Sequence, residues 1–137
     1  MFKRSLLLGI VAGLLAGVAS VVYQRVYFSS LGADFTKVAS PASIIAGSTI
    51  GCILASIGYW LLTKWLKNTG EVIFNFVFVV LSFASILAIF AAKLPLDLET
   101  PELFPGLTVP MHFFPALGWF TLKPLFIKSN DLQKSFE

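Results

Sequence analysis

The sequence predicts an all-α integral membrane protein, folded as a four-helix bundle with both termini in the cytoplasm. Of its 137 residues, 57% are hydrophobic and 12% are charged, whereas soluble domains average about 25% charged residues. Four apolar runs have roughly the 20 residues that a helix needs to cross a bilayer. The basic residues lie at the ends of these runs, which is typical of membrane topology. We therefore expect the lipid bilayer as a partner and no nucleic acid.

The four spans are predicted from the apolar runs and from the signals at their ends. The first covers about 5–27. The second covers about 41–63, and Ser40-Pro41 places a capping hydroxyl before a proline at the first helical position. The third covers about 71–92, and the fourth about 107–127, after a short helical turn at "TPELF" and a break at Pro105-Gly106. Residues 1–127 then form one domain, and residues 128–137 form a cytoplasmic tail.

The first span also has features of a secretory signal peptide. "MFKR" is a suitable basic start, and "AGVAS" resembles a cleavage site near Ala19. The apolar run continues through Val22, so we expect a retained membrane helix, with cleavage as the alternative.

The orientation follows from the distribution of lysine and arginine. Seven of the ten lie at one set of helix ends and three at the other, where most of the acidic residues also lie. Because cytoplasmic loops carry the excess of basic residues, we expect a multi-pass protein of the bacterial inner (plasma) membrane with a cytoplasmic N-terminus and C-terminus. The larger set is Lys3, Arg4, Lys64, Lys67, Lys123, Lys128 and Lys134, and the smaller is Arg25, Lys37 and Lys93.

Small residues at four-residue spacing predict where the first two helices touch. The first span carries Gly9, Gly13 and Gly17, and the second carries Gly47, Gly51 and Ala55, beside a neighbouring stripe of Ser48, Cys52 and Ser56. Such stripes allow helix backbones to approach closely in a membrane. We expect the two helices to pack on each other within one chain. The alternative is that one stripe faces a second copy.

The single histidine, His112, marks the candidate site. It lies between two prolines, and Pro115 has no N–H and crowds the carbonyl of Met111, which predicts a kink. On a helix, His112 shares a face with Thr108. We expect an outward-facing pocket lined by four residues at similar depth with a basic residue at its rim, namely His112, Thr108, Gln24 and Ser48, and Arg25. His112 is then either a structural hydrogen-bonding group or a ligand or proton site.

Several classes of small membrane protein are excluded by missing residues. One cysteine cannot form the pair that thiol oxidoreductases use, and one histidine gives a single haem ligand per chain. The small multidrug exporters need an acidic residue in the first span, and this chain has none there. Dual-topology fluoride channels are expected to show a weak charge bias, whereas the bias here is strong. No catalytic motif is present. We therefore expect no catalytic residue, no metal and no cofactor.

The order of the segments resembles a known family. A glycine-rich first helix, a second helix of small residues and an apolar third helix precede "LTVPMHFFPALGWFTLKPLF". This arrangement resembles small four-helix bacterial membrane proteins that are catalogued as a domain of unknown function. That family is associated with a Met-His pair and a later proline in the last helix, which Met111, His112 and Pro124 match. The resemblance implies the fold and the location, and brings no activity.

Two functions of different kinds follow from these observations. The first, which the glycine stripes favour, is a structural or interaction subunit that binds another membrane protein or forms a homo-oligomer. The second is a ligand-binding or transport module that uses the pocket around His112. A water-accessible cavity at His112 would favour the second function, and a tightly packed histidine would favour the first.

Overall fold

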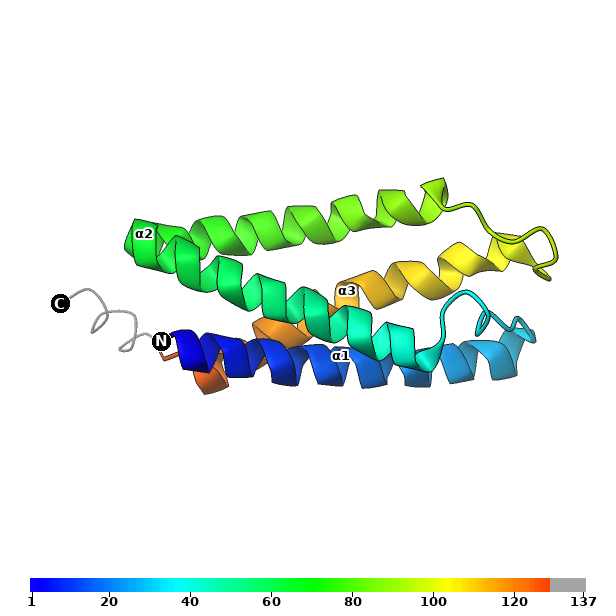
Figure 1. Cartoon of the computed structure of the whole chain (residues 1–137), viewed down its shortest axis with the longest axis horizontal. Coiled ribbons are helices and arrows are strands. Elements are labelled where there is room, and N and C mark those ends of the chain that lie inside the picture. Colours follow the sequence, from blue (N-terminus) through cyan, green and yellow to red (C-terminus); the bar gives the residue numbers. More distant parts are fainter. Residues whose placement is uncertain (129–137) are drawn as a thin grey trace.

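The computed structural model describes residues 1–128 and is helical, without strands, over that range. Three α-helices, α1 (Phe2–Leu31), α2 (Pro41–Ala91) and α3 (Phe104–Phe126), are joined by loops and a short 3-10 helix, η1 (Pro101–Leu103). Figure 1 shows that α2 folds back on itself and that α1 and α3 lie along it. The N-terminus, the reversal of α2 and the end of α3 share one end of the molecule, here called the bend end; the loops form the opposite, loop end.

The predicted count of four helices is wrong. The predicted second and third spans, 41–63 and 71–92, both belong to α2, a single element of 51 residues. The chain reverses inside α2 at Lys67, whose φ of 55° and ψ of −131° are not helical. Because the reversal is confined to one residue, no loop separates the two parts. We call residues 41–66 the first arm and residues 68–91 the second arm. The predicted tail, 128–137, lies outside the described residues except for Lys128.

Gly70 allows the two arms to meet beside the reversal. It is buried, and a Cβ atom added there would overlap the backbone carbonyl of Leu62 and lie 2.9 Å from the backbone nitrogen of Thr63. Any larger residue would therefore force the arms apart. The left-handed conformation needed for the turn falls on Lys67 instead.

The glycines of α1 lie directly against the first arm. A Cβ atom at Gly9 would be 2.6 Å from the carbonyl oxygen of Cys52, and one at Gly17 would be 2.8 Å from the Cα of Ile45. The expected contact between these two segments is therefore present. However, a Cβ atom at Gly47 or Gly51 would have no neighbour within 4 Å. The glycines of α1 therefore do not pack against the stripe of Gly47, Gly51 and Ala55. They pack against the neighbouring stripe, which contains Cys52 and Ser56.

Aromatic rings bind α3 to α2 near the bend end. Trp119 is fully buried, and its ring centroid lies 5.8 Å from that of Tyr59, 5.4 Å from that of Phe74 and 6.0 Å from that of Phe78. On its other side α3 approaches α1 closely, since a Cβ atom at Gly118 would lie 3.2 Å from the carbonyl oxygen of Ala12. This cluster fixes the position of α3 along the length of both arms.

Two tyrosines of α1 hold the beginning of α3 at the loop end. Tyr23 donates a hydrogen bond to the carbonyl oxygen of Gly106 (3.0 Å), and Tyr27 donates one to that of Leu103 (2.8 Å). In the loop after α1, the backbone N–H of Thr36 donates to the Asp34 carboxylate, which lowers the pKa of that carboxyl below its usual value. The loop end is thus ordered by hydrogen bonds to the backbone.

The outer surface is strongly apolar. Two helices of the described residues, α1 and α2, are long and apolar enough to cross a membrane, judged by length and composition, and α3 is not one of them. Large exposed side chains occur along both α1 and the second arm, among them Leu14, Val22, Phe76, Phe83 and Leu87. Exposed apolar side chains in this number are typical of a surface that contacts a membrane or a partner.

Candidate functional site

A cavity of about 680 Å³ lies between the two arms of α2 and α3. Pockets for small molecules commonly measure about 300–1,000 Å³. Gly47 and Gly51 form part of the wall on the first arm, Phe78 and Leu81 lie on the second arm, and His112 lies on α3. The open space beside the two glycines is therefore the cavity itself, and their lack of side chains contributes to its size.

His112 is held by a hydrogen bond within α3. Its Nδ1 lies 2.7 Å from the carbonyl oxygen of Thr108, one helical turn earlier. A carbonyl oxygen can only accept, so Nδ1 carries the proton of this hydrogen bond. In the neutral ring, Nε2 is then an unprotonated acceptor. The imidazole is half-buried at the cavity wall.

The prolines of α3 do not end the helix. Pro110, Pro115 and Pro124 all lie inside it. Pro115 lines the cavity, and its carbonyl oxygen accepts a long contact of 3.9 Å from the thiol of Cys52. This contact places α3 level with the middle of the first arm. The kink predicted at Pro115 stays a prediction.

Three of the five predicted pocket residues line the cavity, namely Ser48, Thr108 and His112. Gln24 does not. It is buried at the loop end, where its amide Nε2 donates to the carbonyl oxygen of Ala39 (2.7 Å) and its Oε1 has no partner among the described residues. Arg25 is exposed on α1 and also lies outside the cavity wall. Gly13 of α1 lies against Ser48 and Thr49 of the first arm, so the level predicted for residues 24 and 25 was wrong by about three helical turns.

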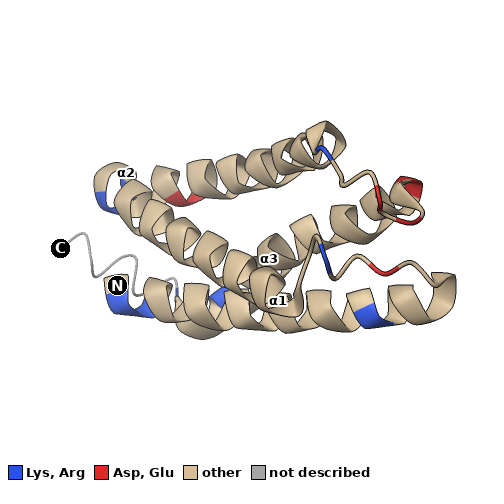
Figure 2. Ribbon diagram, turned by 45° about the vertical axis from the view of Figure 1, so that its right-hand side comes forward, with Lys and Arg blue, Asp and Glu red and all other residues tan. Residues whose placement is uncertain are grey.

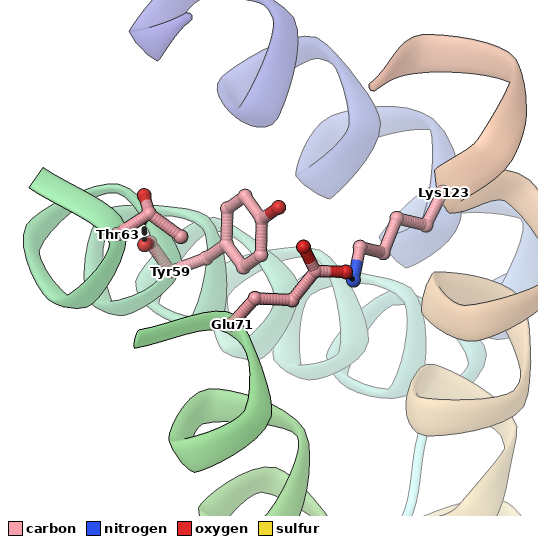
Figure 3. A network of polar contacts seen from close by, with 4 residues as sticks. All are labelled: Tyr59, Thr63, Glu71 and Lys123. Atoms are coloured by element: carbon pink, nitrogen blue, oxygen red, sulfur yellow. Dashed lines mark hydrogen bonds and ion pairs between the residues drawn. The ribbon is translucent and has the colours of Figure 1, made fainter. Parts of the chain in front are cut away.

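A second polar site lies at the bend end and was missed by the sequence analysis. Lys123 of α3 forms an ion pair with Glu71 of the second arm, and their side chains are only 12% and 27% exposed. Figure 3 shows both beside Tyr59 and Thr63 of the first arm, and the ammonium nitrogen of Lys123 is 5.1 Å from the centroid of the Tyr59 ring. The second arm and α3 are antiparallel, so the first residues of the arm lie beside the last residues of α3. An acidic residue at the start of one helix and a basic residue at the end of the other are the signal that could have revealed the pair.

Aromatic side chains separate the two sites. Phe74 lines the cavity, and its ring contacts those of Tyr59 and Trp119 at centroid distances of 5.2 and 5.4 Å. Lys123 lies on the far side of this layer, over Tyr59. Three buried polar atoms, the hydroxyl of Tyr59, Nε1 of Trp119 and Oδ1 of Asn75, have no partner among the described residues. Phe74 is thus shared by the cavity wall and the aromatic cluster, and the ion pair fastens α3 to α2 at the bend end.

The described residues of the two sites do not form the grouping of side chains that metal binding requires. Within residues 1–128, no three His, Cys, Asp or Glu side chains come together as metal ligands. His112 contacts no acidic side chain, and Cys52 is buried against the carbonyl of Pro115. What the arrangement can do is bind a molecule between the arms.

Comparison of the chain with protein-family models, curated proteins and solved structures gives no significant match. The resemblance to the family of unknown function thus stays a prediction.

Proposed function

We propose that this protein is a membrane-embedded binding module whose cavity takes a small apolar molecule from the bilayer. The observation that supports this function over a structural subunit is the cavity of about 680 Å³ beside His112. A helix contact surface would present packed side chains there, whereas Gly47 and Gly51 face open space. The apolar wall suits a hydrocarbon chain, and the imidazole suits a polar group attached to it.

The charge distribution supports the proposed placement in the membrane. Figure 2 shows a concentration of basic residues at the bend end and of acidic residues in the loops of the opposite end, although each end also carries residues of the other sign. Since basic residues favour the cytoplasmic side, we propose a multi-pass protein of the bacterial inner membrane, with the N-terminus and the end of α3 in the cytoplasm. The cavity then lies at the depth of the hydrocarbon chains.

Labelling of single cysteines tests this orientation. In a Cys52→Ala background, we expect a membrane-impermeant maleimide added to intact cells to modify Asp97→Cys and not Asn68→Cys. Both positions are exposed, at opposite ends of the molecule. Permeabilised cells are the control, in which both positions should react. Modification of the cysteine at 68 alone in intact cells would reverse the proposed topology.

Photolabelling in liposomes tests the binding function. A long-chain alkyl diazirine is expected to label Met111, which lines the cavity and is only 9% exposed. The fully buried Leu8, outside the cavity, should stay unlabelled. Gly47→Leu places a side chain in the cavity near Met111, because Ser48 and Met111 lie one turn before the contacting pair Cys52 and Pro115. It should lower labelling at Met111 at least tenfold.

The control for this variant is Val22→Leu on the exposed face of α1, which should label at Met111 as the wild type does. Labelling confined to outward-facing positions such as Phe83, in wild type and variant alike, would contradict the proposed function. So would cross-links from the cavity wall to a second copy, because a helix of that copy would then occupy the space.

A further inference from the structure

The polar groups of the cavity wall are mainly hydrogen-bond acceptors. The Nδ1 proton of His112 is used by the carbonyl oxygen of Thr108, which leaves Nε2 as an acceptor in the neutral ring. No N–H group of a lysine, arginine, asparagine, glutamine or tryptophan side chain belongs to the described cavity wall. A ligand that only accepts hydrogen bonds would therefore find few donors.

The hydroxyl groups of the wall follow the same pattern. Each hydroxyl has one proton to donate. Four of the six hydroxyl groups in the described wall donate it to a backbone carbonyl oxygen of their own helix or of the residue that caps it. Two hydroxyls, those of Ser20 and Ser48, are free to donate or accept, and that of Ser20 is buried without a partner among the described residues. The four committed donors and their acceptors are Ser43 to Ser40 (2.8 Å), Ser82 to Phe78 (2.8 Å), Ser85 to Ser82 (2.7 Å) and Thr108 to Phe104 (2.9 Å).

The described part of the wall also carries no formal charge. No Asp, Glu, Lys or Arg is among the described residues that line the cavity. The ion pair at the bend end lies behind Phe74, where Glu71 and Lys123 already neutralise each other. Because an unpaired charge is costly to bury, neither an anionic nor a cationic group would be stabilised in this cavity.

His112 and Ser82 lie at the same height across the cavity. The second arm and α3 are antiparallel, with Glu71 paired to Lys123 at one end and Phe83 packed on Phe113 further along, their ring centroids 5.2 Å apart. This register places Ser82, eleven residues after Glu71, level with His112, eleven residues before Lys123. Both residues line the cavity.

From this arrangement we infer that the cavity is selective for an uncharged apolar molecule that carries a hydroxyl group, such as a long-chain alcohol. The hydroxyl donates its one proton to Nε2 of His112, with the hydroxyl oxygen of Ser82 as a second acceptor at the same height. The hydrocarbon chain lies against the wall that Gly47 and Gly51 form. This inference rests on the proposed binding function, and it adds the chemical class of the ligand.

Competition in the photolabelling assay tests the inference with four molecules of the same chain length. Hexadecanol is an uncharged donor, hexadecyl methyl ether is an uncharged acceptor, hexadecanoate is an anion and hexadecyltrimethylammonium is a cation. Hexadecanol should suppress labelling of Met111 at a concentration at least tenfold below that of the other three. The ether is the decisive control because it keeps the chain and the oxygen but has a methyl group in place of the hydroxyl proton.

Variants of His112 connect this preference to the imidazole. His112→Leu should remove the difference between alcohol and ether while the diazirine still labels Met111. His112→Gln should retain the preference because its amide oxygen can accept. Ser82→Ala serves as a second variant and should reduce the preference, whether or not His112→Leu folds.

The outcomes separate this inference from the proposed function. If Met111 is labelled and the ether competes as well as the alcohol, the inference is wrong and the binding function stands. A preference for hexadecanoate or for the quaternary ammonium compound would also overturn it, as would an unchanged alcohol preference in folded His112→Leu. If Met111 is not labelled at all, the binding function itself is wrong.

Discussion

Gly13→Ile is expected to destabilise the protein by about 3 kcal/mol or more, or to prevent its accumulation, whereas Gly51→Ile should change stability by less than about 1 kcal/mol. A Cβ atom at Gly13 would lie 2.5 Å from the Cα of Thr49, so a branched side chain must push α1 away from the first arm. A Cβ atom at Gly51 meets nothing within 4 Å. Thermal unfolding in detergent, followed by circular dichroism, measures both.

The pair is well matched because both glycines lie inside long helices and receive the same side chain. Leu14→Ile, at an exposed position of α1, controls for the effect of a branched residue on helix propensity. Equal melting temperatures for Gly13→Ile and Leu14→Ile would mean that α1 and the first arm do not pack as described. A large loss in Gly51→Ile would mean that the space beside this glycine is filled.

Removal of one partner of the ion pair at the bend end should have the second large effect. Lys123→Met is expected to cost about 3 kcal/mol, the lower end of the range for a buried pair, because Glu71 keeps a carboxylate that is only 27% exposed and has lost its counter-charge. The double variant Glu71→Gln with Lys123→Met should be more stable than Lys123→Met alone, since no unpaired charge remains.

Lys93→Met is the matched control for the ion pair, because Lys93 is exposed at the loop end. It should change stability by no more than about 0.5 kcal/mol. Chemical unfolding of the three variants in detergent gives the comparison. If the double variant is less stable than Lys123→Met, the two side chains are not coupled through their charges, and the role assigned to the pair is wrong.

The reversal of α2 illustrates why the helix count could not be read from the sequence. The predicted spans 41–63 and 71–92 left residues 64–70 as a connection between two helices. In the structure, the positive φ that a tight reversal needs falls on Lys67, a residue type for which this conformation is unfavourable. Gly70 is needed instead for the close approach of the arms. The sequence thus indicated that the chain changes direction between the two spans. Which residue adopts the positive φ depends on how the arms pack.

The candidate site was predicted only in part. Apolar runs and proline positions were enough to place His112, Thr108 and Ser48 at one height, and all three line the cavity. The same argument failed for Gln24, which lies about three helical turns nearer the loop end than Gly13, the residue of α1 that meets Ser48, and which donates to the carbonyl oxygen of Ala39. Four-residue spacing likewise identified Gly47 and Gly51 as special without indicating that they border open space. The rotation of each helix about its axis depends on tertiary contacts, which a single sequence does not display.

The single-residue reversal at Lys67 has a mechanical consequence for access to the cavity. The second arm, residues 68–91, extends about 36 Å from this point at the helical rise of 1.5 Å per residue. A rotation of about 10° there would displace the far end of the arm by roughly 6 Å, but would move Phe74, seven residues from the pivot, by only about 2 Å. Such a rotation would have to separate Ile89 from the buried cluster that it forms with Phe35 and Phe104, so these contacts keep the arms together at the loop end while the ion pair near the pivot stays almost fixed.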